Sequence, residues 1–473
     1  MKDQLNEILA VTERAASGAT CAQRLHEHLL AALLCPEKST VSNLICTGGH
    51  QQEDWSPHYR LYSRSRVDEG VLFQEVRQQV LAHLPPEAPL VVAMDDTLVR
   101  KRGAHIAGVA WRRDPLGPAF QTNLVRGQRF LQFSAAWPLE DGQARMMPIG
   151  FFHAPPAAKP AQGADAATLE QHREEKKQRA LNQQALAHMK SLRAQCEAKR
   201  RIVFNGDGSY TNAAVLKGLP PQSIYLGRIR KDAKLHELAH GDHATTGRRP
   251  SYGPQAPTPE QLRTEENIPW QTVSAFAGGK RHQFRIKTLS PLLWRKSGAA
   301  RPVRIVVIAP LGYRLKNAGR MLYRQPAYLL CTDPDLPLEE LLQDYLWRWG
   351  IEVNFREEKS LIGAGQAQVR TAASNTHLPA VIVAAYALLW TSALGLRARG
   401  AQVPHLRPPK WRRRAPEEDR LFSTGDLLRT LRFEFWSGAL RPSTFFHFVT
   451  DPQPETKWQK PGPSLPGALF AAA

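Results

Sequence analysis

Two aspartate sites in this sequence directly follow short apolar runs. Asp95 and Asp96 follow Leu90–Met94, and Asp207 stands two residues after Arg201–Asn205. Enzymes of the α/β class often keep reactive groups beyond the carboxyl ends of such strands. Aspartate at a strand end is also a common turn former or helix cap, so neither site indicates a function alone.

A third group of polar residues lies in the segment 344–359. Its members stand at offsets of 0, 3, 7 and 14, namely Tyr345, Arg348, Glu352 and Lys359. At about 100° per residue, these offsets fall within an arc of roughly 60° on one helical face. Large apolar residues surround them, namely Trp347, Trp349, Ile351 and Phe355. A polar stripe among such residues indicates a site rather than a surface, although Glu357 and Glu358 could belong to a solvated face.

The spacing of this third group resembles a known signature. It is similar to the Y-(2)-R-(3)-E-(6)-K pattern of a hairpin-forming subgroup of the DDE transposases of bacterial insertion sequences. The resemblance runs from about Pro89 to Thr371 and includes Gly363-Ala-Gly365 after the signature. It implies an RNase H-like core with three metal-binding carboxylates, which match Asp95, Asp207 and Glu352.

The first of these carboxylates has two candidates. Family members often have Asp-x-Thr or Asp-x-Ser here, which favours Asp95, two residues before Thr97, and leaves Asp96 as the alternative. Successive side chains of a strand point to opposite faces, so only one of the two can face the site. The resemblance implies two magnesium ions about 4 Å apart, for which manganese can substitute, and which activate water and stabilise the leaving oxygen. Hard oxygen ligands suit magnesium.

The resemblance also implies contacts to DNA. Arg348 and Lys359 would hold phosphates near the strand end, arginine by a bidentate contact and lysine as a point charge. Tyr345 would donate to a phosphate as well. Tyr328 stands where a related enzyme has a base-stacking aromatic residue, and it could stack or be a strand core residue. Arg228 is either a phosphate contact or a surface residue.

Further contacts to the DNA backbone have weaker support. The candidates are Lys101, Arg102 and the basic run 397–414, which holds seven Arg or Lys residues and no acid.

The elements that must position these residues follow from the apolar spacing. We expect strands at Leu90–Met94, Ile106–Trp111, Phe130–Trp137, Arg201–Asn205 and Ser223–Ile229, with a long charged helix within 164–201. This order predicts an α/β fold with a mixed sheet, and residues 87–229 are the first part of the RNase H-like core.

The remaining regions are predicted as follows. Residues 230–335 form a mostly β insertion, with strands at Trp270–Phe276, His282–Leu289, Val303–Ile308 and Ala327–Thr332. Residues 336–400 form the second part of the core, with the signature helix from Glu339 to about Leu361. Residues 1–86 form a helical region, either DNA-binding or a packing subdomain. Residues 401–473 form a basic, Pro-rich C-terminal region.

The net charge indicates a polyanionic partner. Of 473 residues, 63 are Lys or Arg and 43 are Asp or Glu, which gives a net charge of +20. Such a chain attracts nucleic acid. Hydrophobic residues make up 42%, which excludes wholesale disorder and a fibrous class.

Cysteine and histidine usage gives no sign of a structural metal site. The five cysteines form no CxxC pair, which argues against disulfides or a zinc knuckle and indicates a reducing compartment. The N-terminus lacks the apolar run of a secretory signal. We interpret His236, His240 and His243 as surface residues rather than metal ligands.

One apolar stretch has the length of a membrane span. Leu378–Leu396 contains 19 residues without a charge. It is rich in alanine, contains a proline and stands alone in a charged chain, so we favour a core helix over a membrane segment.

Together these features predict a transposase in the bacterial cytoplasm, associated with the nucleoid. It would bind the terminal inverted repeats of a mobile element, cleave the ends with magnesium and join the 3′ ends to target DNA. The resemblance implies that it acts as a homodimer in a synaptic complex. The alternatives are a domesticated, catalytically idle DNA-binding protein and a host RNase H-fold nuclease.

Overall fold

The computed structural model describes every residue except 51, 104, 115–116, 118–120, 122, 240–250, 298–300, 315–318, 402, 404–421 and 437–473. Most of the predicted C-terminal region 401–473 and of the basic run 397–414 therefore lies outside the described residues. The same holds for His240 and His243.

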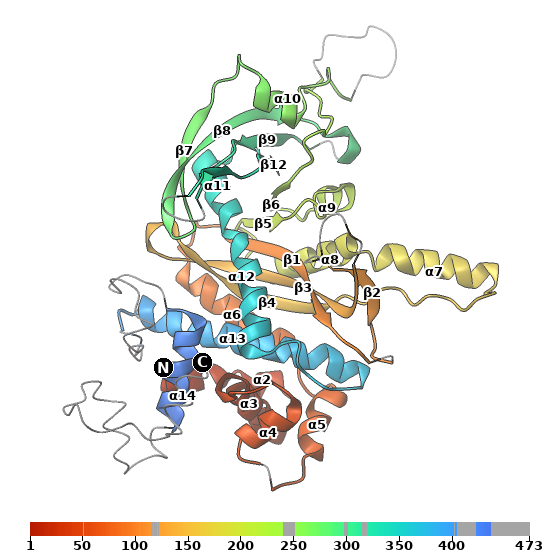
Figure 1. The fold of residues 1–473 in the computed structure, drawn as a ribbon, viewed down its shortest axis with the longest axis vertical. Helices are drawn as coiled ribbons and strands as arrows, with labels where there is room; N and C mark the ends of the chain where they lie inside the picture. The colour runs from red at the N-terminus through yellow and green to blue at the C-terminus, as the bar shows by residue number, and fades with distance from the viewer. Residues whose placement is uncertain are drawn as a thin grey trace.

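A mixed sheet of ten strands runs through the centre of the structure, in the order β2-β3-β1-β5-β6-β12-β9-β8-β7 with β4 beside β3 (Figure 1). Its first six strands are β1 (Leu90–Arg100), β2 (Ala110–Arg113), β3 (Leu124–Pro138), β4 (Ala144–His153), β5 (Ile202–Gly206) and β6 (Ser223–Arg228). Strand β3 is antiparallel to β1 and β4, whereas β1, β5 and β6 are parallel. The predicted α/β class is confirmed, and the arrangement is consistent with an RNase H-like core.

In the first half of the sheet one predicted strand was wrong and one strand was missed. The run Ile106–Trp111 contributes only to the short strand β2, which begins at Ala110. Strand β4 was not expected, because Pro148 and Gly150 interrupt its apolar run and most of its residues are buried on both faces. A register shift in β3, between Phe133 and Ser134, accommodates this irregular strand.

The four strands predicted within residues 230–335 are present. They are β7 (Gln271–Ala277), β8 (Lys280–Leu292), β9 (Val303–Ile308) and β12 (Ala327–Cys331). They extend the central sheet, because β12 pairs antiparallel with β6. The same region holds the short helix α10 (Pro259–Thr264), the 3-10 turn η2 (Arg295–Ser297) and a two-stranded hairpin of β10 (Gly312–Tyr313) and β11 (Leu322–Tyr323).

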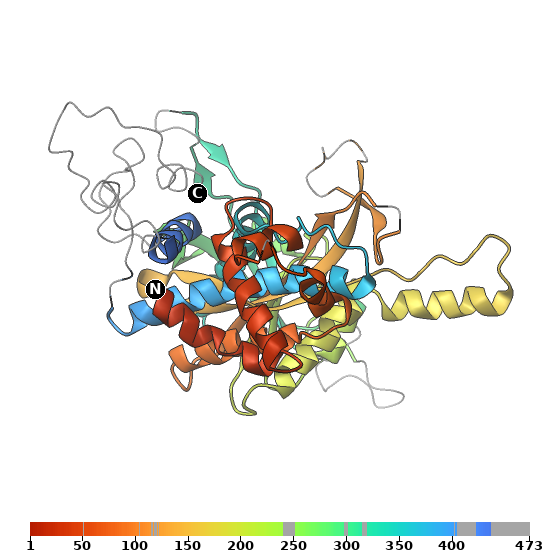
Figure 2. The ribbon, with the colours of Figure 1, turned by 90° about the horizontal axis from the view of Figure 1, so that it is seen from below.

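The N-terminal region is helical, as predicted. Its helices are α1 (Lys2–Leu9), α2 (Thr12–Ala15), α3 (Ala19–Leu34), α4 (Val41–Thr47), α5 (Ser56–Ser63) and α6 (Glu69–His83). Four of them, α1, α3, α5 and α6, pack against α13 (Ala372–Ala398), and both α13 and α6 also pack against β4 of the sheet (Figures 1 and 2). The N-terminal helices therefore share one core with a helix near the other end of the chain.

Helix α13 contains the apolar stretch that has the length of a membrane span. Among the described residues it is the one helix that is long and apolar enough to cross a membrane, but 94% of its most apolar window is buried inside the protein. The interpretation as a core helix is therefore the one that the structure supports.

The charged segment 164–201 forms two helices rather than one. They are α7 (Ala166–Gln178) and α8 (Leu181–Ala194), separated at Arg179 and Ala180. Helix α7 has no buried residue and projects from the body (Figures 1 and 2). Helix α8 packs through Leu186, Met189 and Leu192, as predicted.

The predicted signature helix is also divided. It consists of α11 (Leu338–Trp347), α12 (Trp349–Glu357) and one π-helical turn, η3 (Glu358–Ile362). The remaining helices are α9 (Ala213–Gly218), the 3-10 turn η1 (Glu140–Gly142) and α14 (Thr424–Trp436).

Candidate active site

Asp95 faces the helices of the signature segment. It lies within β1 rather than after it, since β1 continues to Arg100. Val91 and Ala93, which share its face of the strand, pack in one cluster with Ile351 of α12. The parallel pairing of β1 with β5 ends at Ala93, so β1 has no neighbour on that side at Asp95. Asp95 thus borders a crevice at the carboxyl end of β5.

Asp207 enters the same crevice from the end of β5. Its Oδ1 accepts hydrogen bonds from the backbone nitrogen and the hydroxyl of Ser209, at 2.8 and 2.6 Å. Nearby, the amide of Asn205 donates to the carbonyl oxygen of Asp344 at 2.9 Å and so ties β5 to α11. These contacts orient the carboxylate of Asp207 and fix the strand that presents it.

Arg348 and Glu352 complete this group from the α11–α12 junction. Nη2 of Arg348 is 3.2 Å from Oε1 of Glu352, and Nη1 of Arg348 is 3.6 Å from Oδ2 of Asp95. One guanidinium therefore contacts carboxylates from both the sheet and the helix.

The three predicted carboxylates line one cleft of about 810 Å³. Its wall also contains Arg228, Tyr328 and Arg348, which were predicted as DNA contacts. Residues far apart in the sequence thus meet at one place. They come from β1, β6, β12 and α12 and from the end of β5.

Asp96 points away from this cleft. Its Oδ2 is 3.0 Å from Nε of Arg129, and its Oδ1 accepts a hydrogen bond of 3.3 Å from Tyr210. Both partners lie on the other face of β1 from Asp95. The geometry therefore favours Asp95 as the member of the cleft.

Burial changes the ionisation of Asp95. Desolvation raises its pKa to about 7, and the neighbouring carboxylate of Asp207 acts in the same direction. The backbone amide of Asp96 and the guanidinium of Arg348 lower the pKa. Burial therefore disfavours the charged form of Asp95, and a further cation beside it would lower its pKa.

Lys359 diverges from the single helical face that the spacing predicted, whereas Tyr345 stays beside Arg348. Tyr345 is packed under Arg348, whose guanidinium carbon is 5.8 Å from the ring centroid. Lys359 lies in the π-helical turn, and its ammonium donates to the hydroxyl of Thr97 at 2.5 Å. The breaks at Arg348 and η3 change the angular spacing, so Lys359 reaches a place further along β1.

The other predicted DNA contacts differ in exposure. Arg228 is exposed at the end of β6. Tyr328 is buried in β12, and its hydroxyl donates to Glu260 of α10. Lys101 is also buried, and its ammonium donates to the carbonyl oxygens of Gly365 and Ala367, at 3.4 and 2.7 Å. Its charge therefore holds the segment after η3 against β1 rather than facing solvent.

The cleft residues that sequence reasoning missed include an aromatic and a basic one from a distant segment. Trp294 and Lys296 line the cleft from the region around η2. The signal was the Trp294-Arg-Lys296 motif itself, in which an aromatic residue stands beside two basic ones. Both Tyr328 and Trp294 thus offer an aromatic ring to the cleft.

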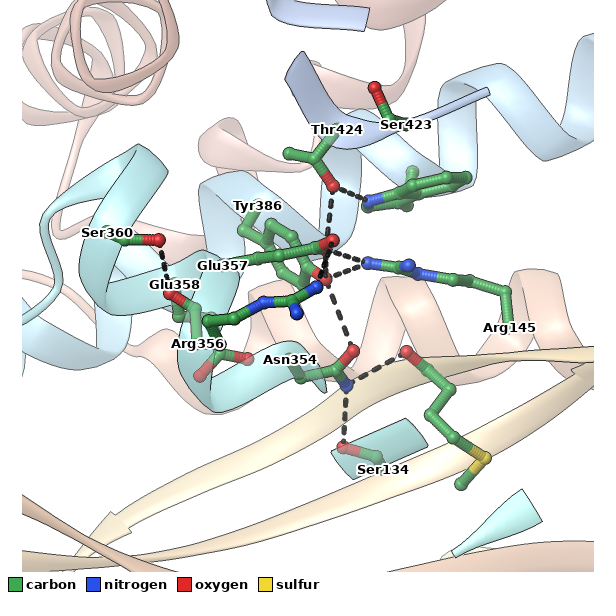
Figure 3. Close-up of polar contacts among 12 residues, drawn as sticks. Ser134, Arg145, Asn354, Arg356, Glu357, Glu358, Ser360, Tyr386, Ser423 and Thr424 are labelled. Atoms are coloured by element: carbon green, nitrogen blue, oxygen red, sulfur yellow. Dashed lines mark hydrogen bonds and ion pairs between the residues drawn. The ribbon is translucent and has the colours of Figure 1, made fainter. Parts of the chain in front are cut away.

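A buried polar network holds α12 in place (Figure 3). Glu357 accepts hydrogen bonds from Arg145 of β4, from Tyr386 of α13 at 2.8 Å and from Thr424 of α14 at 2.7 Å. Asn354 donates to the carbonyl oxygen of Met146 at 2.9 Å. Three separate elements, β4, α13 and α14, therefore meet at the end of α12 opposite Glu352.

Glu358 belongs to a second buried contact. It is 2% exposed and accepts a hydrogen bond of 2.9 Å from Gln132, which pairs with Asp95 across β1 and β3. Glu357 is buried as well. The interpretation of Glu357 and Glu358 as a solvated face was therefore wrong, because α13 and α14 cover this side of the helix.

The family model of the DDE superfamily endonucleases matches residues 17–298, more than half of the chain. The chain belongs to this family. The DDE match begins in the N-terminal helices and includes Asp95 and Asp207, but it ends before the signature segment and Glu352. A comparison with curated proteins gave no match.

Family membership gives the broad activity. DDE superfamily endonucleases are nucleases that act on DNA and generally use divalent metal ions. The carboxylates of Asp95, Asp207 and Glu352 offer the hard oxygen donors that such an ion prefers. Among the described residues, however, no three His, Cys, Asp or Glu side chains are close enough to hold an ion together, and Arg348 lies between Asp95 and Glu352. The donor types fit a divalent ion, whose binding would have to compete with this guanidinium.

Proposed function

We propose that this DDE endonuclease is a transposase of the Y-(2)-R-(3)-E-(6)-K subgroup. It binds the terminal inverted repeats of a mobile element, hydrolyses the phosphodiester bond at the ends and joins the 3′ ends to target DNA. The observation that carries the proposal is the meeting of Asp95, Asp207 and Glu352 at one cleft with Arg348 between two of them.

In this proposal Asp95, Asp207 and Glu352 hold two magnesium ions, which manganese can replace. Bound there, the ions lower the pKa of a coordinated water and stabilise charge on the leaving oxygen. The protein's own groups then orient the DNA. Arg228 is exposed at the cleft and suits a bidentate contact to a phosphate.

The remaining signature residues are proposed to act on the strand end. When DNA enters the cleft, Arg348 gives up its contact with a carboxylate and binds a phosphate instead. Lys359, at Thr97, gives a point charge further along the strand. Tyr345 packs its ring against Arg348, with 5.8 Å between the ring centroid and the guanidinium carbon, and so positions this side chain. Tyr328 or Trp294 stacks on an unpaired base if a hairpin intermediate forms.

The proposed assembly is a homodimer that brings two DNA ends together, in the cytoplasm of a bacterial cell. The net charge of +20 supports binding to nucleic acid. The helices α1–α6 are proposed to take part in recognising the ends, although they also pack on α13.

A cleavage assay tests the proposal. Labelled duplexes carrying each end of the encoding element are incubated with magnesium, manganese or chelator, singly and as paired ends. We expect metal-dependent nicking at the ends by the wild type and none by Glu352→Gln. Glu339→Gln changes an exposed glutamate of α11 and serves as the matched control, which should cut normally.

The alternatives predict other results. End-specific binding without nicking, on single and paired ends alike, would indicate a domesticated DNA-binding protein. Metal-dependent cutting without preference for the ends would indicate a host RNase H-fold nuclease. Cleavage that survives in Glu352→Gln would overturn the proposed carboxylate set.

A further inference from the structure

The exposed face of β2 carries an unusual combination of side chains. Trp111 is 66% exposed although it stands in a strand of the central sheet. Arg113, two residues along the same strand, is exposed too, and Leu124 opposite it is 52% exposed. Among the described residues no hydrogen bond or ion pair involves the Arg113 side chain. An aromatic and a basic residue thus stand side by side in solvent.

This face of β2 lies on the same side of the sheet as the cleft, and the sheet between the two is covered, since Gln128 and Gln132 are buried. Trp111 pairs with Arg126 of β3, and Gln128 and Gln132 further along β3 pair with Val99 and Asp95 of β1. Paired residues, and every second residue along a strand, share one face of a sheet. The only register shift in β3 lies beyond these residues, after Phe133. Trp111 and Asp95 are therefore on the same face.

The separation suits a double helix. The partners of Asp95 and Trp111 on β3, Gln132 and Arg126, are six positions apart, which corresponds to roughly 20 Å at about 3.3 Å per residue. A duplex rises about 3.4 Å per base pair, so about six base pairs span this distance. Lys359, held at Thr97 on the same face of β1, lies on the path.

The charges along this path are basic. Arg113 stands beside Trp111, and Lys359 lies between them and the cleft. The nearest acid in sequence, Asp114, is 8% exposed and already pairs with Arg100 at 2.8 Å. A polyanion therefore meets little repulsion from described residues here. Charge complementarity favours nucleic acid as the partner over a protein that has no acidic patch.

We propose that Trp111 and Arg113 form a second DNA contact, which holds the duplex about six base pairs from the site of cleavage. The inference rests on the proposed function, because it takes the cleft to be where the DNA is cut. Arg113 contacts a backbone phosphate, and the indole of Trp111 packs on the sugar–phosphate surface.

Fluorescence anisotropy tests this contact. Two labelled duplexes carry the element's end, one extending about fifteen base pairs to either side of the cut and one only about three. We expect Trp111→Ala and Arg113→Ala to weaken binding to the long duplex by about five- to twentyfold and to leave the short duplex unchanged. Arg113→Ala should also lower the salt dependence by about one phosphate contact. Wild-type affinity of both variants for the long duplex would overturn the proposal.

The control is Lys280→Ala. Lys280 is exposed at the start of β8, where β7 turns into β8. Strand β7 contacts η1, which follows the end of β3 that lies away from β2. Lys280→Ala should bind both duplexes like the wild type. Equal thermal unfolding of all variants excludes misfolding, and a dimer lost in Trp111→Ala by sedimentation would assign the face to a chain–chain contact and overturn the proposal.

The test separates this contact from the proposed function. Weaker binding of Trp111→Ala with retained cleavage by Glu352→Gln would keep the contact and reject the carboxylate set. Unchanged binding of both β2 variants, with cleavage lost in Glu352→Gln, would reject only the contact.

Discussion

Arg348 contacts Asp95 across the cleft, with 3.6 Å between Nη1 and Oδ2. Its other terminal nitrogen is 3.2 Å from Oε1 of Glu352. In the proposed transposase, one guanidinium therefore neutralises two of the three carboxylates that would hold metal ions. DNA phosphate and metal would compete for the partners of this one side chain.

Arg348→Gln is expected to bind manganese more tightly than the wild type in the absence of DNA, by about fivefold. The reason is that a partly exposed ion contact contributes up to about 1 kcal/mol, which the metal no longer has to replace. Titration followed by electron paramagnetic resonance measures this, and Arg348→Lys, which keeps the charge, is the control. Weaker manganese binding in Arg348→Gln would show that the guanidinium organises the carboxylates instead.

Asp95→Asn is expected to lose cleavage by about 100-fold or more, since removing even an outer-shell partner of a metal site costs 10–100-fold. Asp96→Asn should keep most of the activity, because Asp96 faces Arg129 and Tyr210 on the other side of β1. Single-turnover nicking, with thermal unfolding as a check on folding, measures both. The reverse order would assign the site to Asp96.

Glu357→Gln and Glu358→Gln are expected to differ strongly in stability. Burial disfavours the charge of Glu357, but Arg145 outweighs this and lowers its pKa, so Glu357 is charged beside a buried arginine. Removing that charge leaves Arg145 without its carboxylate partner, and we expect a loss of about 3 kcal/mol in the free energy of unfolding. Burial raises the pKa of Glu358 to about 8, so glutamine resembles its neutral form at pH 7 and should cost less than about 1 kcal/mol.

The pH dependence of these variants provides a check by urea unfolding. The folded-state pKa of Glu358 lies above its unfolded value, so the folded protein holds the proton more tightly. Its contribution to stability is present at low pH and is lost as the pH rises from about 4 to about 8. Glu358→Gln should remove this part of the change in unfolding free energy with pH. An unchanged pH dependence would contradict the raised pKa of Glu358.

The N-terminal helices are expected to lose stability in acid. His28 is fully buried, with hydrogen bonds of 2.8 Å to Tyr62 and 2.9 Å to His58, and burial lowers its pKa to about 3. Because the unfolded chain binds the proton more tightly, this contribution is complete above pH 6.5 and is lost as the pH falls toward 3.

Urea unfolding of His28→Gln between pH 7.5 and 5 checks this prediction. The free energy of unfolding of the variant should fall less steeply with pH than that of the wild type. His282→Gln, a change in β8 outside the buried cluster, should follow the wild type. His58 would still contribute, since burial lowers its pKa as well. Parallel curves for His28→Gln and the wild type would contradict the prediction.

The sequence predicted the strands that carry the carboxylates because their signals are local. Leu90–Met94 is a continuous apolar run, and Gly206 follows another, so each strand and the aspartate behind it could be recognised alone. The four strands of residues 230–335 were found in the same way. Strand β4 was not, because a strand with proline and glycine, buried on both faces, has no alternating pattern.

Other features depended on contacts between distant segments. The helical spacing brought Tyr345, Arg348 and Glu352 together correctly as a group, but the π-helical turn that redirects Lys359 to Thr97 has no local signal. Lys101 was predicted as a DNA contact and Glu357 as part of a solvated face, because a charge in the sequence does not reveal what covers it.

The sequence by itself determined the residue types, most of the strands and the order of the three carboxylates, because backbone propensity and apolar periodicity act over a few residues. Only the tertiary structure decided which aspartate faces the cleft, that Arg348 joins Asp95 to Glu352, and that α13 is covered by the N-terminal helices. These depend on the sheet register and on the packing of segments hundreds of residues apart, which no local pattern encodes.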